Sequence, residues 1–289
     1  MTTLQSDTGK LRRVLLKHAR DAFQGPDAVA RQWQALNYLS PPDYAAACAE
    51  SDAFAALLEG MGVEVSWMPG GDRGMDSIYV RDAAVVTDGG VILCRMGKDA
   101  RAAEPEAVAE SLESLEVPVL GAIEGAGSLE GGDVVWVDPK TLAVGRGYRT
   151  NDEGIRQLRA LLDPEVALVT VPLPHWKGPG DVFHLMSMIS PLAPDLALVY
   201  APLLPVPFRE LLVERGIGLV EVPQEEFDSL GGNVLAVAPR VAVAAQGNPV
   251  TRSRMEAAGV EVHTYVGAEI SAKGCGGPTC LTRTLERDG

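Results

Sequence analysis

Three stretches of the sequence follow one plan: RDAAVVTDGGVILCRMG at residues 81–97, GGDVVWVDPKTLAVGRG at 131–147 and GGNVLAVAPRVAVAAQG at 231–247. In each, an apolar run leads through a polar turn into a second apolar run, which is typical of a β-hairpin. A fourth stretch, HLMSMISPLAPDLALVYAP at 184–202, repeats the plan with two prolines and an aspartate in its turn. This self-similarity predicts a fold that is built from repeated units.

Each hairpin is followed by a helical segment and one more strand. The predicted helices cover 103–115, 151–162, 206–216 and 251–259, and the predicted closing strands cover 117–121, 167–174, 217–223 and 260–266. The repeating unit is therefore strand, strand, helix, strand.

Polar residues stand at equivalent points where the first strand of each unit opens. They are Asp82, Asp133, His184, Asn233 and Cys280, with separations of 51, 51, 49 and 47 residues. A period of about 50 residues with one small sheet per unit is typical of propellers rather than of a doubly wound sheet. We predict an α/β fold, a five-bladed ββαβ propeller with pseudo-fivefold symmetry.

The fifth unit needs both ends of the chain. Only a short strand-like segment follows Cys280, whereas the N-terminal region offers a strand at 10–18, a helix at 42–62 and a strand at 63–69. We expect residues 1–289 to form a single domain, closed by pairing of the N- and C-terminal segments. Two alternatives are an open parallel sheet, which is disfavoured because a hairpin precedes every helix, and two separate domains, for which no long linker is visible.

The composition narrows the partners and the compartment. There are 39 acidic residues against 25 Lys and Arg, a formal charge of −14 that repels nucleic acid and anionic membranes. No apolar stretch approaches the roughly 20 residues that a membrane helix needs, and no signal peptide is visible. The four cysteines form no CxxC pair, which favours a reducing compartment. We expect a cytoplasmic protein that binds neither nucleic acid nor membranes.

The residues that open the first strands would converge near the propeller axis. They include a thiol, an imidazole and carboxylates, the components of nucleophilic catalysis with acid/base support. Cys280 follows a glycine-rich approach, GCGGPTC, that lets a substrate come close. The alternatives are that Cys280 is a buried apolar thiol, that Cys275 is the reactive thiol, and that His184 is structural rather than an acid/base group.

Acidic residues cluster in two motifs. Glu130 and Asp133 lie in LEGGDVV, Asp82 lies in SIYVRD, and Asp76 precedes Asp82 by six residues. Such residues also serve as turn formers, but a carboxylate at the site could bind a planar guanidinium through two hydrogen bonds. No HExxH, CxxC, P-loop or GxGxxG in its usual context occurs, so we expect no metal and no cofactor.

Four motifs carry a resemblance to a known family. YVRD (79–82), LEGGDV (129–134), HLMS (184–187) and GGPTC (276–280) resemble, in order and approximate spacing, motifs of the guanidino-modifying enzymes of the pentein superfamily. These include arginine deiminase, dimethylarginine dimethylaminohydrolase and amidinotransferases. The resemblance runs from about residue 10 to the C-terminus.

The resemblance implies a role for each matched residue. Cys280 would attack the guanidino carbon to form a thiouronium intermediate, His184 would be the acid/base, and Glu130 would orient it. The substrate-binding residues would be Asp82 for the guanidinium, Asp76 for an α-amine, Arg95 and Arg149 for a carboxylate, together with Asp133.

The same resemblance leaves the substrate open. Arg81 matches the deiminases, whereas Met186 stands where they commonly have an aspartate and would leave room for an alkylated nitrogen. The expected reaction is hydrolysis of arginine or an N-substituted arginine to a ureido product and ammonia or an amine. The alternatives are amidino transfer to an acceptor amine and a non-catalytic binding protein. The family often forms homodimers, so a homodimer is an open expectation.

Overall fold

The computed structural model describes residues 2–71, 73–180 and 183–289, and in these residues the strands form five small sheets. Four sheets share one topology, in which an antiparallel hairpin is joined by a parallel third strand. Their strands are β4 (Ala84–Thr87), β5 (Gly90–Leu93) and β6 (Val119–Ala122); β7 (Val134–Asp138), β8 (Thr141–Arg146) and β9 (Ala167–Pro172); β10 (Ile189–Ala193), β11 (Leu196–Val199) and β12 (Gly218–Glu221); and β13 (Val234–Ala238), β14 (Val241–Ala245) and β15 (Glu261–Tyr265).

The fifth sheet combines strands from both ends of the chain. Its order is β1 (Thr2–Thr3), β16 (Arg283–Asp288), β2 (Leu11–Leu16) and β3 (Glu64–Trp67). Strand β16 pairs antiparallel with β2, and β3 pairs parallel with β2. The C-terminal strand therefore takes the place that the first hairpin strand has in the other sheets.

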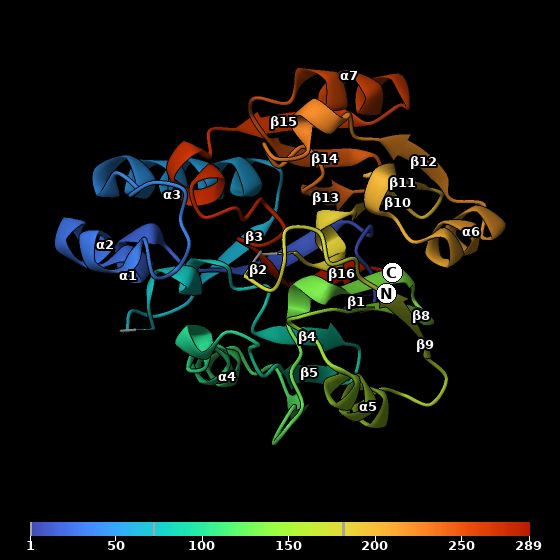
Figure 1. Ribbon diagram of the computed structural model, residues 1–289, viewed down its shortest axis with the longest axis horizontal. Helices are drawn as coiled ribbons and strands as arrows, with labels where there is room; N and C mark the ends of the chain where they lie inside the picture. Colours follow the sequence, from blue (N-terminus) through green and yellow to red (C-terminus); the bar gives the residue numbers. More distant parts are fainter. Residues whose placement is uncertain (1, 72, 181–182) are drawn as a thin grey trace.

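The helices lie at the periphery of the molecule, outside the sheets (Figure 1). They are α1 (Ala19–Phe23), α2 (Pro26–Gln32), α3 (Tyr44–Gly60), α4 (Glu104–Ser114), α5 (Asp152–Leu161), α6 (Val206–Glu214) and α7 (Pro249–Ala257). Local chemistry fixes several starts: the side chains of Asp43 and Asn151 accept hydrogen bonds from the first turns of α3 and α5. No helix among the described residues is long and apolar enough to cross a membrane.

The apolar core is divided among the spaces between neighbouring sheets and under the helices. One cluster joins Ile92 of β5, Trp136 of β7, Leu142 of β8 and Leu158 of α5. Strand β8 is buried over most of its length because a helix covers one side and other strands the other. Each sheet therefore lies between two apolar clusters and contributes side chains to both.

Short turns separate the predicted polar residues from the strands. The predictions placed Asp82, Asp133, His184, Asn233 and Cys280 at strand starts, but each first strand begins one to five residues later. The 3₁₀ turn Leu185–Ser187 lies between His184 and its strand, and the 3₁₀ turn Gly131–Asp133 contains Asp133 itself. These turns take the side chains out of the alternating strand pattern and let them lie over the ends of the sheets.

A buried aspartate links the N-terminal segment to two other units. Asp7 Oδ1 lies 3.2 Å from Arg81 Nη2, and Asp7 Oδ2 accepts a hydrogen bond of 2.8 Å from the Trp136 backbone. Burial would raise the pKa of Asp7, but the charges of Arg81 and Arg287 outweigh it and lower the pKa. Asp7 is therefore an ionised counter-ion to buried guanidinium groups.

Replacing Asp7 with alanine tests this role. We expect Asp7→Ala to lower the free energy of unfolding by about 3–5 kcal/mol, because Arg81 would remain buried without its counter-ion. Urea denaturation is the measurement, since guanidinium chloride carries a cation that could enter the site. Glu210→Ala, on the exposed face of α6, should change the value by less than about 0.5 kcal/mol. Equal effects of the two substitutions would contradict the prediction.

Candidate active site

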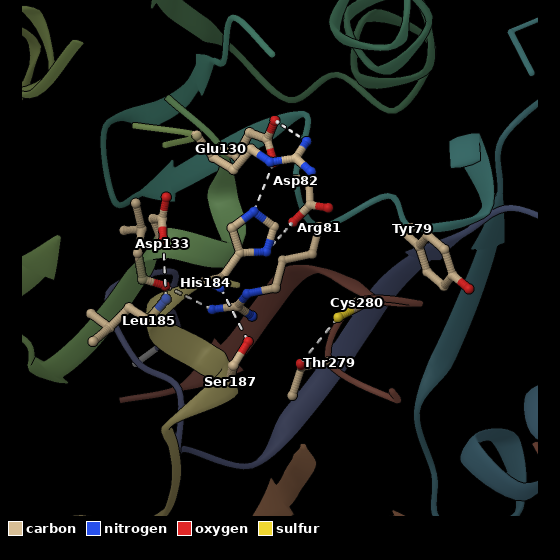
Figure 2. A network of polar contacts seen from close by, with 12 residues as sticks. Tyr79, Arg81, Asp82, Glu130, Asp133, His184, Leu185, Ser187, Thr279 and Cys280 are labelled. Atoms are coloured by element: carbon tan, nitrogen blue, oxygen red, sulfur yellow. Dashed lines mark hydrogen bonds and ion pairs between the residues drawn. The ribbon is translucent and has the colours of Figure 1, made fainter. Parts of the chain in front are cut away.

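The polar residues before the strands meet at a cavity of about 130 Å³. Of the predicted site residues, Asp76, Asp82, Arg149, His184 and Cys280 line it. Figure 2 shows the His184 ring between Glu130 and Asp82, and Cys280 lies across from the ring with no polar contact drawn between them. A thiol and an imidazole thus line one cavity.

Glu130 holds His184 from behind. His184 Nε2 lies 2.7 Å from Glu130 Oε2, and Glu130 Oε1 accepts a 2.9 Å hydrogen bond from the Gly97 backbone. Arg149 Nη1 lies 3.7 Å from the same oxygen, Oε1. Glu130 is fully buried and does not line the cavity. Its position fits orientation of the imidazole rather than direct contact with a substrate.

The electrostatics of this pair keep both partners charged at neutral pH. Burial would lower the pKa of His184, but Asp82, Asp133 and Glu130 raise it to about 9. For Glu130, burial would raise the pKa, but the hydrogen bond and charge of His184 lower it to about 2. His184 is therefore a proton donor in the resting protein.

Asp82 has one occupied and one unoccupied oxygen. Its Oδ2 forms a 2.7 Å ion pair with Arg101 Nη1. Its Oδ1 has no hydrogen-bond partner among the described residues and lies 3.9 Å from His184 Nδ1. Arg101 is held in turn by both oxygens of Glu104, at 2.9 and 2.8 Å. This chain of contacts fixes Asp82, and Oδ1 stays buried beside the His184 ring without a hydrogen-bond partner among the described residues.

Cys280 lies in a half-buried position beside Asn233. Asn233 Nδ2 approaches the sulfur to 3.3 Å, and Asn233 Oδ1 accepts from the backbone and hydroxyl of Thr279 at 3.1 and 2.8 Å. A Cβ on Gly277 would meet Asn233 atoms at 2.5 Å, so glycine is required for this approach. Burial and the charge of Asp82 raise the pKa of Cys280 above its ordinary value, so the resting residue is a thiol.

Two predicted substrate contacts lie elsewhere, because neither Asp133 nor Arg95 lines the cavity. Both oxygens of Asp133 are occupied: Oδ1 accepts from the Leu185 backbone at 3.0 Å and Oδ2 from the Thr150 hydroxyl at 2.6 Å. Burial raises the pKa of Asp133 to about 6. Asp133 thus supports the turn that carries His184. Arg95 is exposed and donates to the Gly127 carbonyl.

Sequence reasoning missed several cavity residues. Lys98 and Arg101 line it from the segment after β5, and Phe183, Met186 and Phe227 form an apolar side. Arg101 could have been noticed, because an arginine three residues before a glutamate at a helix start is a pattern that forms ion pairs. Lys98 gives no such signal, because its contacts are to Asp76 and to the backbone of Leu36.

The carboxylates and imidazole suit a guanidinium better than a metal. Ligand atoms of Asp82, Glu130 and His184 lie within 4.8 Å of one another. A metal requires a neutral imidazole nitrogen, whereas Nε2 of His184 is already paired with Glu130 and its pKa is raised to about 9. The donor set does not fit a metal ion.

Comparison with known proteins agrees with this chemistry. A sequence model described as N,N dimethylarginine dimethylhydrolase, eukaryotic, matches residues 27–282. The N(G),N(G)-dimethylarginine dimethylaminohydrolase of Pseudomonas aeruginosa is 28% identical over 250 residues, 85% of this chain and 91% of that enzyme. The enzyme of the same name from Streptomyces coelicolor is 34% identical over 197 residues, 68% of this chain and 72% of that enzyme.

A solved structure shares the fold. It is that of a Pseudomonas aeruginosa dimethylarginine dimethylaminohydrolase variant, with serine in place of a cysteine, complexed with citrulline. The TM-score is 0.77 at 24% identity, with 96% of this chain and 100% of that chain covered. The sequence matches place the chain among hydrolases that act on carbon–nitrogen bonds of guanidino groups. The chain belongs to the dimethylarginine dimethylhydrolase family.

The pairing of His184 with Glu130 predicts a pKa change. We expect Glu130→Gln to lower the pKa of His184 from about 9 toward its ordinary value of 6.5, because the substitution removes the negative charge that favours the imidazolium. Titration of the histidine ring protons by NMR is the measurement.

A surface pair provides the control for that titration. Glu261→Gln breaks a 2.8 Å contact between Glu261 and His263 and should leave the pKa of His184 unchanged.

The pair of His184 and Glu130 should also stabilise the fold of the wild-type protein below pH 6.5. This contribution should be lost as the pH rises through about 9, because the pKa of His184 in the folded state lies above that in the unfolded state. An unchanged His184 pKa in Glu130→Gln would contradict the prediction.

Proposed function

We propose that this chain hydrolyses the guanidino group of arginine or an N-substituted arginine, with Cys280 as nucleophile and His184 as acid/base. The observation that carries the proposal is Asp82 Oδ1, a buried carboxylate oxygen without a hydrogen-bond partner among the described residues, close to the protonated His184. A guanidinium offers N–H donors in a plane that such an oxygen accepts. Binding there would place the guanidino carbon between the histidine and the thiol.

The first half of the reaction forms a covalent intermediate. When the guanidinium binds, the Cys280 thiol releases its proton to solvent, and the resulting thiolate attacks the guanidino carbon. A C–S bond forms while the carbon becomes tetrahedral. His184 donates the proton of Nδ1, the nitrogen that faces Asp82, to the leaving nitrogen. The C–N bond breaks and ammonia or an amine departs, which leaves a thiouronium on Cys280 and a neutral imidazole.

The second half restores the protein. The neutral His184 accepts a proton from water as its oxygen attacks the thiouronium carbon, and the C–S bond then breaks. The electrons of the C–S bond return to the sulfur, and the hydroxyl proton of the intermediate passes to solvent as the neutral ureido product leaves. The sulfur takes up a proton again to restore the thiol, and Glu130 stabilises the imidazolium that has formed again. The cycle consumes one water and needs neither an oxidant nor a metal.

The substrate itself supplies part of the activation. The thiol pKa is raised in the resting protein, so a bound guanidinium, by bringing a positive charge next to the sulfur, would stabilise the thiolate. Asn233 and Thr279 hydrogen bonds act in the same direction. The thiol would thus become reactive when the substrate is present.

The remaining cavity residues support an arginine-like substrate. Arg149 is a cation for a carboxylate, and Phe183, Met186 and Phe227 can contact an alkyl group on the guanidino nitrogen. We assign Asp133 to positioning of the His184 turn rather than to substrate contact, because both its oxygens are bound within the protein.

We also propose how the five sheets assemble and where the protein works. Their common topology and the pairing of β16 with β2 support one domain, a closed five-bladed propeller. Cys48, Cys94 and Cys280 are free thiols, which supports a cytoplasmic location.

Product analysis tests the reaction. Incubation with arginine, monomethylarginine or dimethylarginine should give a ureido product together with ammonia or the matching amine, detected by mass spectrometry. Cys280→Ser should lower the rate by at least about 10³-fold, whereas Cys48→Ser, on α3, should retain activity. Loss of substrate that requires an added acceptor amine, without ureido product, would instead indicate amidino transfer.

The activation by substrate charge gives a second test. The ultraviolet thiolate absorbance of wild type minus that of Cys280→Ser should rise only at pH values above the ordinary thiol pKa of about 8.5. Guanidinium ion should shift this rise to lower pH, because its positive charge favours the thiolate. Sodium chloride at equal ionic strength is the control. An unchanged titration would show that the cation does not act on the sulfur.

A further inference from the structure

The cavity contains a carboxylate whose binding capacity is already used by the protein. Lys98 Nζ forms a 2.9 Å ion pair with Asp76 Oδ2 and donates a 3.0 Å hydrogen bond to the Leu36 carbonyl. All three residues line the cavity. A carboxylate and a carbonyl together can bind an ammonium group by accepting its hydrogen bonds. Here the ammonium of Lys98 itself is bound to both acceptors.

Separating Lys98 from Asp76 would cost free energy. The side chains of Lys98 and Asp76 are only 16% and 9% exposed, so their ion pair is poorly screened by water. A second ammonium could reach Asp76 only if Lys98 left, which would separate a largely buried pair. If Lys98 stayed, two like charges would be close together.

Two cationic side chains in the cavity lining could bind a carboxylate of the substrate. Lys98 has three N–H donors, of which Asp76 and Leu36 use two. Arg149 lies next to this segment, because a Cβ placed on Gly97 would come within 2.9 Å of the Arg149 Cα. Lys98 and Arg149 therefore contribute cationic groups to the cavity lining from neighbouring backbone segments, and Arg149 Nη1 also lies 3.7 Å from Glu130 Oε1.

We infer that Lys98 determines specificity: the preferred substrate is a guanidino carboxylic acid that has no free ammonium on its α-carbon. This inference rests on the proposed hydrolysis and changes its preferred substrate from arginine to an analogue that lacks the α-ammonium. The guanidinium would bind Asp82 Oδ1, and the carboxylate would bind Lys98 and Arg149. The molecule would carry one positive and one negative charge and thus add no net charge to the cavity.

A matched pair of substrates tests the inference. Arginine and 5-guanidinopentanoate have the same chain and the same carboxylate and differ only in the α-ammonium. We expect wild type to have a kcat/KM at least about tenfold higher for 5-guanidinopentanoate, because like charges in a desolvated site repel strongly. Lys98→Met, which keeps the length but removes the charge, should shift this ratio toward arginine by at least about tenfold.

Further variants separate specificity from folding. Lys98→Arg should keep the wild-type preference, and Lys140→Met, at a lysine whose side chain is 74% exposed, should leave the ratio unchanged. In the double variant Lys98→Met with Asp76→Asn, the gain for arginine should disappear, because that gain needs the Asp76 carboxylate. Circular dichroism identifies any variant that fails to fold, and the wild-type ratio still decides in that case.

The outcomes distinguish the two proposals. If wild type consumes neither compound nor any methylated arginine, the proposed hydrolysis is wrong and the inference is wrong with it. If wild type consumes them but prefers arginine, or if Lys98→Met leaves the ratio unchanged, the hydrolysis stands and the role of Lys98 is overturned.

Discussion

The structure depends on buried guanidinium groups that donate to backbone carbonyls of several sheets. Arg81 donates to Val134 at the start of β7, while Arg283 and Arg287 of β16 donate to Ala84 of β4 and Ala236 of β13. Pairing of its donors stabilises a buried guanidinium, so these contacts restrict how the sheets can be placed, although the Nε of each of these arginines has no hydrogen-bond partner among the described residues. The constraint reaches the site directly, because Arg81 precedes Asp82 and its backbone N–H donates to the Cys280 carbonyl at 3.2 Å. The same interactions that join the sheets thus set Cys280 and Asp82 at a fixed separation.

The site also contains buried charged groups that are paired, and acidic and basic groups alternate in it. Glu104, Arg101, Asp82, His184 and Glu130 form a continuous series of acidic and basic groups, and each is buried. In the proposed reaction, this series of charges determines which group is protonated at each step. The imidazole is protonated before the substrate arrives, whereas the thiol is not yet ionised. The acid is therefore ready at the start, and the base appears only after the leaving group has taken its proton.

The sequence predicted the repeating elements well because hairpins and helices are signalled by local patterns. It also predicted that Asp82, His184 and Cys280 line one cavity, since equivalent positions of a repeat occupy equivalent places. Equivalence did not extend to every role: Asp133 has the repeat position of Asp82, but the Thr150 hydroxyl and the Leu185 N–H occupy its oxygens. Lys98 and Arg101 were missed because a long side chain can point in several directions, and periodicity does not specify which.

The distribution of partners within the cavity explains how an arginine-like cation can bind selectively. Asp76, Asp82 and Asp228 line the cavity and Glu130 lies behind it. Each is paired with a cation of the protein: Lys98 for Asp76, Arg101 for Asp82, Lys177 for Asp228 and His184 for Glu130. Without these cations, the repulsion among buried carboxylates would oppose folding. With them, Asp82 Oδ1 is a buried carboxylate oxygen that has no hydrogen-bond partner among the described residues. In the proposed complex, the guanidinium is selected by its hydrogen bonds to Asp82 Oδ1 rather than by a general negative potential. The cationic side chains of the protein would then bind the carboxylate at the other end of the substrate.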